Sequence, residues 1–251
     1  MPLGYRSVLK MYSSLAHLWP VLNPIEEYSQ EACRLRQLIT SHLSSDGTPS
    51  MVEFGSGGGR LLSYFAGDFH TAAVDLSPDM ILQSMKLNPS TRHTFGDMRT
   101  INLEQQFDVV LIADSIGYAV SQADLRLTIE NGRAHLREGG VMILVPDWTQ
   151  ETFTGSNVWS RTAATDTGEV TLVEYQYLVN TLPRNLRSVF VFLIKDGRTT
   201  SIELDHHTFG LHTEAVWEST IETSGLLGKR VVYLENEYGL SGAAFVCTLD
   251  A

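Results

Sequence analysis

The sequence predicts an α/β fold in which helices cover both faces of a mostly parallel sheet and an antiparallel β-meander is inserted late in the chain. From Met51 to Trp148, short apolar segments of strand length alternate with segments of helical periodicity, which is typical of a parallel sheet. The first of these strands turns into a helix through a run of glycines. After Trp148 the chain becomes rich in Val, Thr, Tyr and Phe, with turn residues between the runs, which indicates an antiparallel meander.

Length and charge restrict the classes of function. The 251 residues, 43% of them hydrophobic, suffice for one large domain, or for one domain with a sizeable insertion. Lysine and arginine number 18 and the acids number 29, so the net charge is 18 − 29 = −11 at pH 7. A surface this acidic repels phosphate backbones and anionic lipids. We therefore expect a small-molecule partner, no nucleic acid and no membrane.

The cysteines and the first residues indicate the compartment. Cys33 and Cys247 are too few for a disulfide framework, which favours a reducing environment and two small buried side chains. No apolar run approaches the roughly 20 residues that span a bilayer, and the start of the chain shows no secretion signal. We expect a cytoplasmic protein that is either a monomer or a homodimer.

Each element of the predicted core follows from a local pattern. Asn23 and Pro24 resemble an N-cap and the first position of a helix, and apolar residues recur at helical spacing as far as Leu43. The strands are then predicted at 51–54, 71–75, 107–113 and 141–146, and the helices between them at 60–65, 78–87 and 123–136. The last helix is expected to stop at 137–140, where a basic turn precedes two glycines.

The rest of the chain is expected to cover and close the core. Meander strands are predicted at 169–179, 187–194 and 199–211, followed by a helix at 213–224 and strands near 230–234 and 243–249. We therefore expect a helical cap over the cofactor (1–50), a cofactor-binding core (51–148), a β insertion that covers the acceptor site (149–211), and a closing helix with two strands (212–251).

The strongest chemical signal is the segment 51–60, in which an apolar strand ends in an acid and turns through glycines into a helix. Glycines permit positive φ angles and let a ligand lie directly against the main chain. The dinucleotide fingerprint G-x-G-x-x-G would need glycine at the place of Arg60. Glu53 would repel a pyrophosphate but suits the ammonium group of a methionine moiety.

Two further loops complete this pattern. Asp75 ends an apolar strand 20 residues beyond Gly55, where a carboxylate can accept hydrogen bonds from ribose hydroxyls. In the next loop, Asp97 can accept from an adenine amino group, and Met98 can lie against the ring. Right-handed crossovers place these loops along one edge of the sheet.

These motifs together resemble the class I methyltransferases that depend on S-adenosylmethionine (SAM). The segments 114–118, 146–153 and 205–225 resemble the small-molecule branch, which includes N,N-dimethyltransferases of amino sugars. The resemblance implies a Rossmann-like, seven-stranded sheet whose last strand is antiparallel, with SAM as cofactor and S-adenosylhomocysteine as product. It also implies a cofactor site made of Tyr12, Glu53, Gly55, Ser56, Gly57, Asp75, Leu76, Met80, Gly96, Asp97, Met98 and Ala113.

Methyl transfer from a sulfonium is an in-line displacement, so the protein mainly aligns the nucleophile and excludes water. The candidate proton acceptors are Tyr118, His206 and His207, and alternation along a strand allows only one of the two histidines to face the site. With His212 they make no good metal-ligand pattern, and we expect no metal. The residues expected to contact the acceptor are Asp114, Tyr118, Asp147 and Trp148.

The leading hypothesis is methyl transfer to a small molecule, with nitrogen favoured over oxygen or carbon as the acceptor atom. A nicotinamide-dependent oxidoreductase shares the glycine turn, but Arg60 and the 96–98 loop count against it. A non-catalytic SAM-binding protein is the third hypothesis. A nucleic-acid methyltransferase is disfavoured by the net charge and the lack of a basic stripe.

Overall fold

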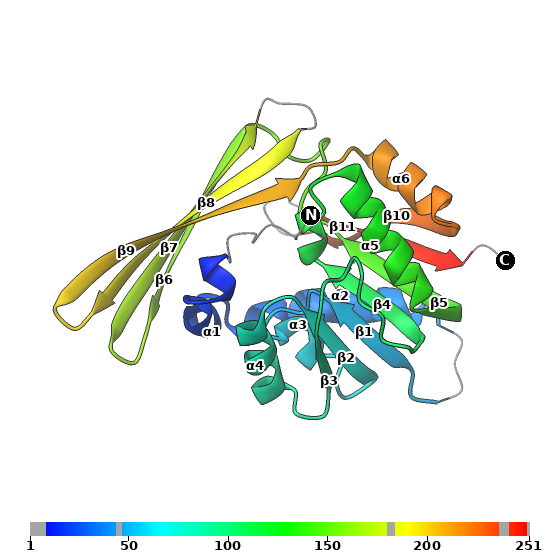
Figure 1. Cartoon of the computed structure of the whole chain (residues 1–251), viewed down its shortest axis with the longest axis horizontal. Helices are drawn as coiled ribbons and strands as arrows, with labels where there is room; N and C mark the ends of the chain where they lie inside the picture. The colour runs from blue at the N-terminus through cyan, green and yellow to red at the C-terminus, as the bar shows by residue number, and fades with distance from the viewer. Residues whose placement is uncertain (1–8, 44–46, 180–183, 236–240, 250–251) are drawn as a thin grey trace, which may run out of the picture.

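The protein, seen here as a computed structural model that describes residues 9–43, 47–179, 184–235 and 241–249, is built on a seven-stranded sheet, sheet A (Figure 1). The spatial order of its strands is β10-β11-β5-β4-β1-β2-β3. Their bounds are β1 (Ser50–Phe54), β2 (His70–Asp75), β3 (Arg92–Phe95), β4 (Phe107–Ala113), β5 (Leu136–Val145), β10 (Leu226–Glu235) and β11 (Ser241–Leu249). The first five pair in parallel, whereas β11 is antiparallel to both β5 and β10. The predicted mostly parallel α/β sheet is confirmed.

Helices cover both faces of sheet A. Their bounds are α2 (Ser29–Thr40), α3 (Arg60–Ser63), α4 (Pro78–Leu87), α5 (Gln122–Ala134) and α6 (Glu214–Thr223). Leu35 of α2 and Leu62 of α3 belong to the core on one face, and Ile129 of α5 and Trp217 of α6 belong to the core on the other. All four side chains are almost completely buried, so strands β1, β4 and β5 are apolar on both faces, as a central parallel sheet requires.

Polar caps fix where the longer helices of the core begin. The Ser77 side chain accepts from the Met80 amide at the start of α4, and Thr213 does the same for Val216 at the start of α6. Ser121 and Asp124 form a reciprocal capping box at the start of α5. Because these caps follow strands, they place each helix N-terminus at the edge where the strand loops gather.

A second, four-stranded antiparallel sheet, sheet B, projects from the core as an extended arm (Figure 1). Its strands are β6 (Ser156–Ala164), β7 (Gly168–Val179), β8 (Asn185–Asp196) and β9 (Thr199–Gly210). The segment 9–28, named the cap segment here, lies between sheet B and α4. It contains three 3-10 turns, η1 (Lys10–Tyr12), η2 (Ala16–Leu18) and η3 (Ile25–Tyr28), and the short helix α1 (Trp19–Leu22). Its Leu18 and Leu22 pack with Phe190 and Phe192 of sheet B.

Polar contacts also tie the cap segment to both of its neighbours. On sheet B, Lys10 pairs with Glu203 at 2.8 Å, and the Met11 amide donates to Asp205 Oδ2 at 2.8 Å. On α4, Gln83 Nε2 donates to the Ala16 carbonyl at 2.6 Å. The cap segment is therefore the piece of chain that links sheet B to the core beside the glycine turn.

Two predicted helix boundaries are wrong. The helix expected at 123–136 ends at Ala134, and the stretch expected to stop it, 137–140, lies inside β5. Leu136 already pairs with Phe107, and Gly140 lets the Asp108 carbonyl approach to where a side chain would stand. At the other helix, Asn23 and Pro24 do not cap α2. A 3-10 turn intervenes, and α2 begins at Ser29 without a side-chain cap.

The sequence patterns also missed β3 and β6. Both are edge strands, and most of their side chains are polar or exposed, so neither shows an apolar run or an alternation of buried residues. Cys247 is buried as expected, whereas Cys33 is exposed on α2. Among the described helices, none has both the length and the apolar content needed to cross a bilayer.

Candidate active site

The glycine turn between β1 and α3 leaves an open face of main chain. Gly55, Gly57 and Gly59 all have positive φ angles, of 69°, 53° and 72°. A Cβ on Gly55 would lie 2.2 Å from Ser115 Oγ, so glycine is required for the close approach of the β4 loop. By contrast, no atom lies within 4 Å of the place of a Cβ on Gly57. The backbone at Gly57 is therefore free to contact a ligand.

Glu53 and Ser56 beside this turn carry buried polar atoms without partners. Glu53 is 3% exposed, and its Oε2 makes no hydrogen bond among the described residues; the same holds for Ser56 Oγ. Burial, followed by the charges of Glu31 and Asp75, raises the pKa of Glu53 to about 8. A buried acceptor without a donor is costly. An incoming ammonium group would satisfy it, so these residues fit the amino-acid end of SAM.

Asp75 stands at the end of β2 and braces the turn. Its Oδ2 accepts from the Gly57 amide at 2.7 Å and its Oδ1 from the Ser77 amide at 2.8 Å. Burial raises the pKa of Asp75 above its ordinary value, although these hydrogen bonds act to lower it. Each carboxylate oxygen keeps a further lone pair, which suits ribose hydroxyls. The neighbouring Leu76 is 57% exposed and offers an apolar surface beside them.

The loop after β3 lies next to Asp75, since the Gly96 amide donates to the Asp75 carbonyl at 3.0 Å. Asp97 in this loop is held by Arg99, whose guanidinium also contacts Asp124. Met98 packs against the core cluster of α5. The structure thus brings the three predicted acidic loops to one edge of the sheet.

Two of the residues predicted to bind the cofactor, Met80 and Ala113, are buried. Met80 is completely buried within α4, so it can support the site only from behind. Ala113, the last residue of β4, is 6% exposed and pairs with Val145. Both predictions stay untested as ligand contacts.

Asp114 and Asp147 follow the adjacent strands β4 and β5 and face each other. The two carboxyl groups are close enough that each shifts the pKa of the other, and neighbouring carboxyl groups of this kind can share a proton. Asp114 combines a φ of +51° with a ψ of −51°, which lies outside the left-handed region and is strained for a non-glycine residue. Its amide donates to the Val145 carbonyl at 2.8 Å, which fixes this strained turn.

The environment of the pair is strongly acidic. Burial, followed by the charges of Asp147, Glu31 and Glu53, raises the pKa of Asp114 well above its ordinary value. Burial, followed by the charges of Glu174 and Glu31, raises the pKa of Asp147 to about 7. Both side chains still reach solvent, so they remain open to a ligand. We conclude that this recess, the acidic recess, favours a cation or an amine.

Next to the acidic recess, four polar side chains form a continuous chain. Tyr118 Oη donates to Tyr12 Oη at 3.0 Å and also lies 2.7 Å from His207 Nδ1, toward which its hydroxyl proton can turn. His207 Nε2 lies 3.0 Å from Asp205 Oδ2. His207 is buried, whereas His206 on the opposite face of β9 is exposed. The structure therefore brings Tyr118 and His207 together and leaves His206 outside.

The remaining predicted residues form the wall of the recess or lie behind it. Trp148 packs edge-to-face on Phe153, with ring centroids 5.3 Å apart, and Phe209 contacts Tyr118 at 4.8 Å. His212 Nε2 lies 2.7 Å from the Ala119 carbonyl and is buried, which makes it a structural residue.

Sequence reasoning missed Asp205, Glu31 and Glu174. A signal for Asp205 was available, because residues two apart on a strand share a face and Asp205 precedes His207 by two. Glu31 accepts from Tyr233 Oη at 2.8 Å. It reaches the site only through the packing of α2 against β10, which no local pattern reveals.

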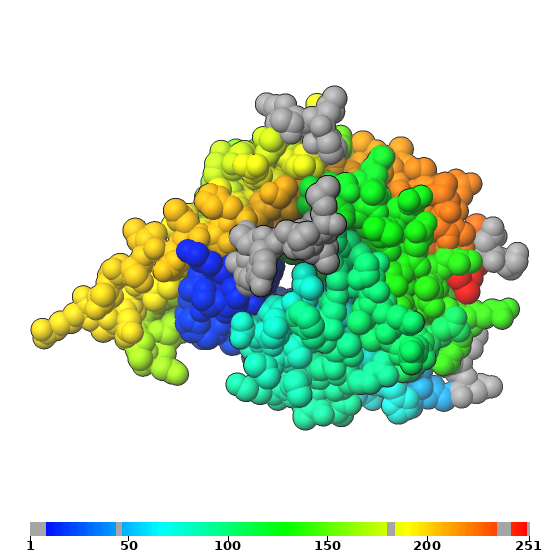
Figure 2. All heavy atoms as spheres, in the orientation of Figure 1, coloured from blue at the N-terminus to red at the C-terminus, as the bar shows by residue number. Residues whose placement is uncertain are grey.

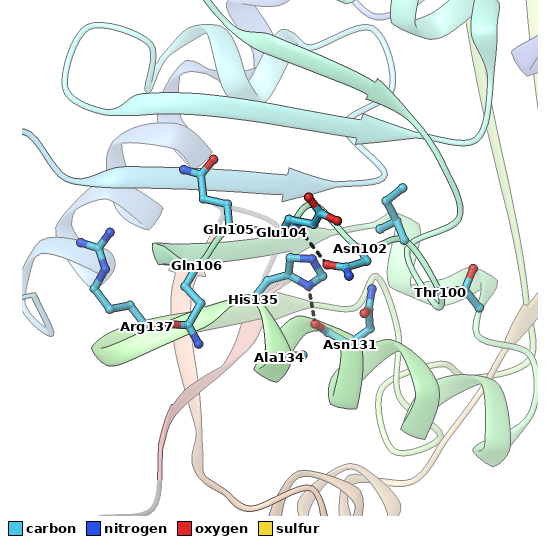
Figure 3. A pocket seen from close by; sticks show the side chains of 10 residues that line it. Thr100, Asn102, Glu104, Gln105, Gln106, Asn131, Ala134, His135 and Arg137 are labelled. Atoms are coloured by element: carbon cyan, nitrogen blue, oxygen red, sulfur yellow. Dashed lines mark hydrogen bonds between the residues drawn. The ribbon is translucent and has the colours of Figure 1, made fainter.

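Two pockets of about 790 Å³ each are also present among the described residues. One is bounded by the cap segment, Arg60 and α4, and a hollow beside the cap segment is visible in Figure 2. The other surrounds His135, whose Nδ1 lies 2.8 Å from the Asn131 carbonyl (Figure 3). It is formed by residues that precede β4, by the last turn of α5 and by the residues just after that helix, so it sits at the opposite end of β4 from Asp114.

The glycine turn yields a matched pair of predictions. Ala at Gly59 would place its Cβ 2.1 Å from Ser84 Oγ at a φ of +72°, so Gly59→Ala should lower the free energy of unfolding by about 3 kcal/mol. Gly57→Ala has free space and should cost only about 1 kcal/mol, yet weaken SAM binding at least tenfold. Denaturant unfolding and calorimetric titration would separate the two effects. Equal SAM affinity in Gly57→Ala and wild type would contradict ligand contact at this face.

Comparison with known proteins points to the part of the chain that contains the glycine turn. Residues 52–142 match a family described as "Methyltransferase domain". A dTDP-3-amino-3,4,6-trideoxy-α-D-glucopyranose N,N-dimethyltransferase of Streptomyces venezuelae is 28% identical over 212 residues, covering 84% of this chain and 86% of the relative. A dTDP-3-amino-3,6-dideoxy-α-D-glucopyranose N,N-dimethyltransferase of Streptomyces fradiae is 31% identical over 168 residues, covering 61% of this chain and 65% of the relative.

A solved structure shares the whole fold. The sugar N-methyltransferase KedS8 from Streptoalloteichus sp ATCC 53650 superimposes with a TM-score of 0.78 at 20% identity, covering 100% of this chain and 99% of that one. The matched domain contains the glycine turn, Asp75 and Asp97, and the resemblance extends through both sheets. The chain contains a methyltransferase domain and is a SAM-dependent methyltransferase.

Proposed function

We propose that the protein transfers a methyl group from SAM to the amino group of an amino sugar. The observation that carries this proposal is the acidic recess, where Asp114 and Asp147 follow the neighbouring strands β4 and β5, next to β1 and its Glu53. Such a recess favours an amine over a hydroxyl. The amino-sugar class is supported by the names of the two N,N-dimethyltransferases to which the chain is similar.

In this proposal the glycine turn and the strand ends hold the cofactor. Glu53 and Ser56 bind its amino-acid end, Asp75 its ribose, and the 96–98 loop its adenine. When bound, SAM supplies a methyl group on an electrophilic sulfonium centre. The protein's part is to align the acceptor nitrogen with that methyl group and to exclude water.

The acceptor has to reach the reaction with a free lone pair on nitrogen. The ionised Asp114–Asp147 pair attracts the amine as an ammonium ion. One proton then leaves the nitrogen for Tyr118 Oη, as Tyr118 passes its own proton to His207 Nδ1 at 2.7 Å. Burial first, followed by the charge and hydrogen bond of Tyr12, raises the pKa of Tyr118 well above its ordinary value, so Tyr118 acts as a phenol that relays a proton.

Removal of the Tyr118 hydroxyl should slow methyl transfer without affecting the cofactor. We expect Tyr118→Phe to lower kcat about 30-fold. This is less than a general base usually contributes, because the fraction of acceptor that arrives as a neutral amine already has its lone pair and needs no proton acceptor. The SAM dissociation constant should stay within about threefold of the wild-type value. Initial rates at saturating SAM, with calorimetric titration of SAM, would measure both. A wild-type kcat in Tyr118→Phe would remove Tyr118 from the reaction.

The substrate class is tested by transfer of labelled methyl from SAM to a panel of acceptors. The panel contains nucleotide-linked and free amino sugars, each matched with the same sugar carrying a hydroxyl in place of the amine. We expect label and an added methyl mass on the amino sugars only. Transfer to the hydroxyl sugars alone would overturn nitrogen as the acceptor. Tight SAM binding without transfer to any amine would overturn the enzyme's proposed substrate class.

A further inference from the structure

Asp205 is a buried acid on β9 that makes hydrogen bonds to three groups. The resemblance to known methyltransferases gives it no role. Its Oδ2 accepts from the Met11 amide at 2.8 Å and lies 3.0 Å from His207 Nε2, and its Oδ1 accepts from the His206 amide at 3.1 Å. Asp205 is 7% exposed. Although burial acts to raise it, the pKa of Asp205 lies below its ordinary value because of the hydrogen bonds from His207 and Met11. Asp205 is therefore an ionised carboxylate.

The charge of Asp205 determines which nitrogen of His207 carries the proton. An ionised carboxylate only accepts hydrogen bonds, so Nε2 of His207 must bear hydrogen. In the neutral ring Nδ1 is then left with its lone pair, and this atom points at Tyr118 Oη, 2.7 Å away. His207 is 1% exposed and packs on the Phe190 ring at 4.6 Å, so water cannot take over the task of orienting it.

We propose that Asp205 is a positioning residue for methyl transfer: it holds His207 with Nδ1 free to accept the proton that Tyr118 relays from the acceptor amine, and its charge stabilises the imidazolium so formed. Every proton in this transfer is accounted for by the residues of this chain of contacts. Tyr118 gains one proton from the amine and loses its own to Nδ1, while Nε2–H stays bonded to Asp205. The same logic applies to an aspartate that orients a catalytic histidine in hydrolases. This inference rests on the proposed function.

Asp205 also connects this chain of contacts to the cap segment. The carboxylate oxygen that bonds His207 also accepts the Met11 amide, and the next residue, Tyr12, stands 3.0 Å from Tyr118. The charged or titratable groups around His207 are Asp205 on β9, Glu174 on β7, Tyr118 after β4 and Tyr12 in the cap segment. Only Asp205 among them bonds Nε2.

Asp205→Asn isolates the charge, because an asparagine carbonyl oxygen can still accept from Met11 and His207. We expect the share of His207 that carries hydrogen on Nε2, followed by NMR in protein labelled at histidine nitrogen, to fall, because the amide of asparagine can also donate to Nε2. The kcat for an amine acceptor should fall about 10- to 30-fold, with KM for both substrates within about threefold of wild type. His207→Gln assigns the resonance, since the chain has 8 histidines.

Glu203→Gln is the matched control. Glu203 also ties the cap segment to β9, through Lys10 at 2.8 Å, but does not touch His207. This variant should keep both the tautomer of His207 and kcat. An equal loss of kcat in the two variants, or an unchanged His207 tautomer in Asp205→Asn, would overturn the proposal.

A double variant tests whether Asp205 acts through Tyr118. If Asp205 acts through Tyr118, then Asp205→Asn should lower kcat less than about twofold in the Tyr118→Phe background. A full additional loss would show that Asp205 acts elsewhere. If the wild-type protein methylates no amine at all, the proposed function fails, while the NMR spectrum still decides whether Asp205 controls the tautomer of His207.

Discussion

Glu53→Gln is expected to weaken SAM binding about 100- to 1,000-fold. Removal of one charge from a buried, hydrogen-bonded pair commonly costs several kcal/mol, and Glu53 Oε2 has no other partner among the described residues. The amide keeps the size of the side chain but cannot balance an ammonium group. Calorimetric titration with SAM and with S-adenosylhomocysteine would measure the loss.

The affinity for SAM is also expected to depend on pH, in a direction that the pKa of Glu53 determines. The pKa of Glu53 is raised to about 8 in the cofactor-free protein, so near pH 7 the side chain is mostly protonated and must release a proton when an ammonium group binds. SAM affinity of the wild type should therefore rise with pH, by up to about tenfold between pH 6 and 7. The Gln variant should lose this dependence.

The same substitution should stabilise the protein without cofactor. The folded pKa of Glu53 lies above its unfolded value, so folding favours the protonated form, and stability is lost as pH rises from about 4.5 towards 8. Glu53→Gln removes that loss and should raise the melting temperature at pH 8. Glu218→Gln on the exposed face of α6 changes the net charge equally and should alter neither property. Lower stability together with unchanged SAM affinity would contradict this account of Glu53.

Asp147→Asn is expected to lower kcat/KM for the amine acceptor about 100-fold while SAM affinity changes little. The variant cannot provide the negative charge that attracts the ammonium form of the acceptor. The pKa of Asp147 is raised to about 7. Below that pH the Asp114–Asp147 pair is neutral, so kcat/KM of the wild type should rise with pH through about 7.

In Asp147→Asn this limb of the kcat/KM profile should disappear or move. Asp166→Asn, in the exposed turn between β6 and β7, is the matched control and should retain the wild-type profile. Asp114→Asn keeps the size and branching of the side chain at this strained position and should show the same loss of acceptor binding. A wild-type kcat/KM profile in Asp147→Asn would show that the acceptor binds elsewhere.

Most of the proposed cofactor site could be predicted from the sequence, because its residues lie at the ends of strands or just after them. Glu53 and Asp75 lie at the ends of β1 and β2, and Asp97 lies in the loop after β3. A parallel sheet must bring these positions to one edge, and the structure places them there. The alternation rule also separated His206 from His207, of which only His207 is buried.

The acceptor side depends on contacts between distant elements, which local patterns do not contain. Asp205 receives the Met11 amide from 194 residues away, and Glu31 affects Asp114 only because α2 crosses the sheet. The end of α5 was mispredicted for a related reason. The segment 137–140 has the composition of a helix stop, but pairing of Leu136 with Phe107 makes it part of β5.

The most direct test of the central claim is a crystal structure of the protein with bound S-adenosylhomocysteine. We predict its ammonium group within about 3 Å of Glu53, its ribose against Asp75 and its chain along the open backbone of Gly57. Density for the ligand in another place, such as the pocket around His135, would contradict the claim that the acidic strand ends of sheet A hold the cofactor.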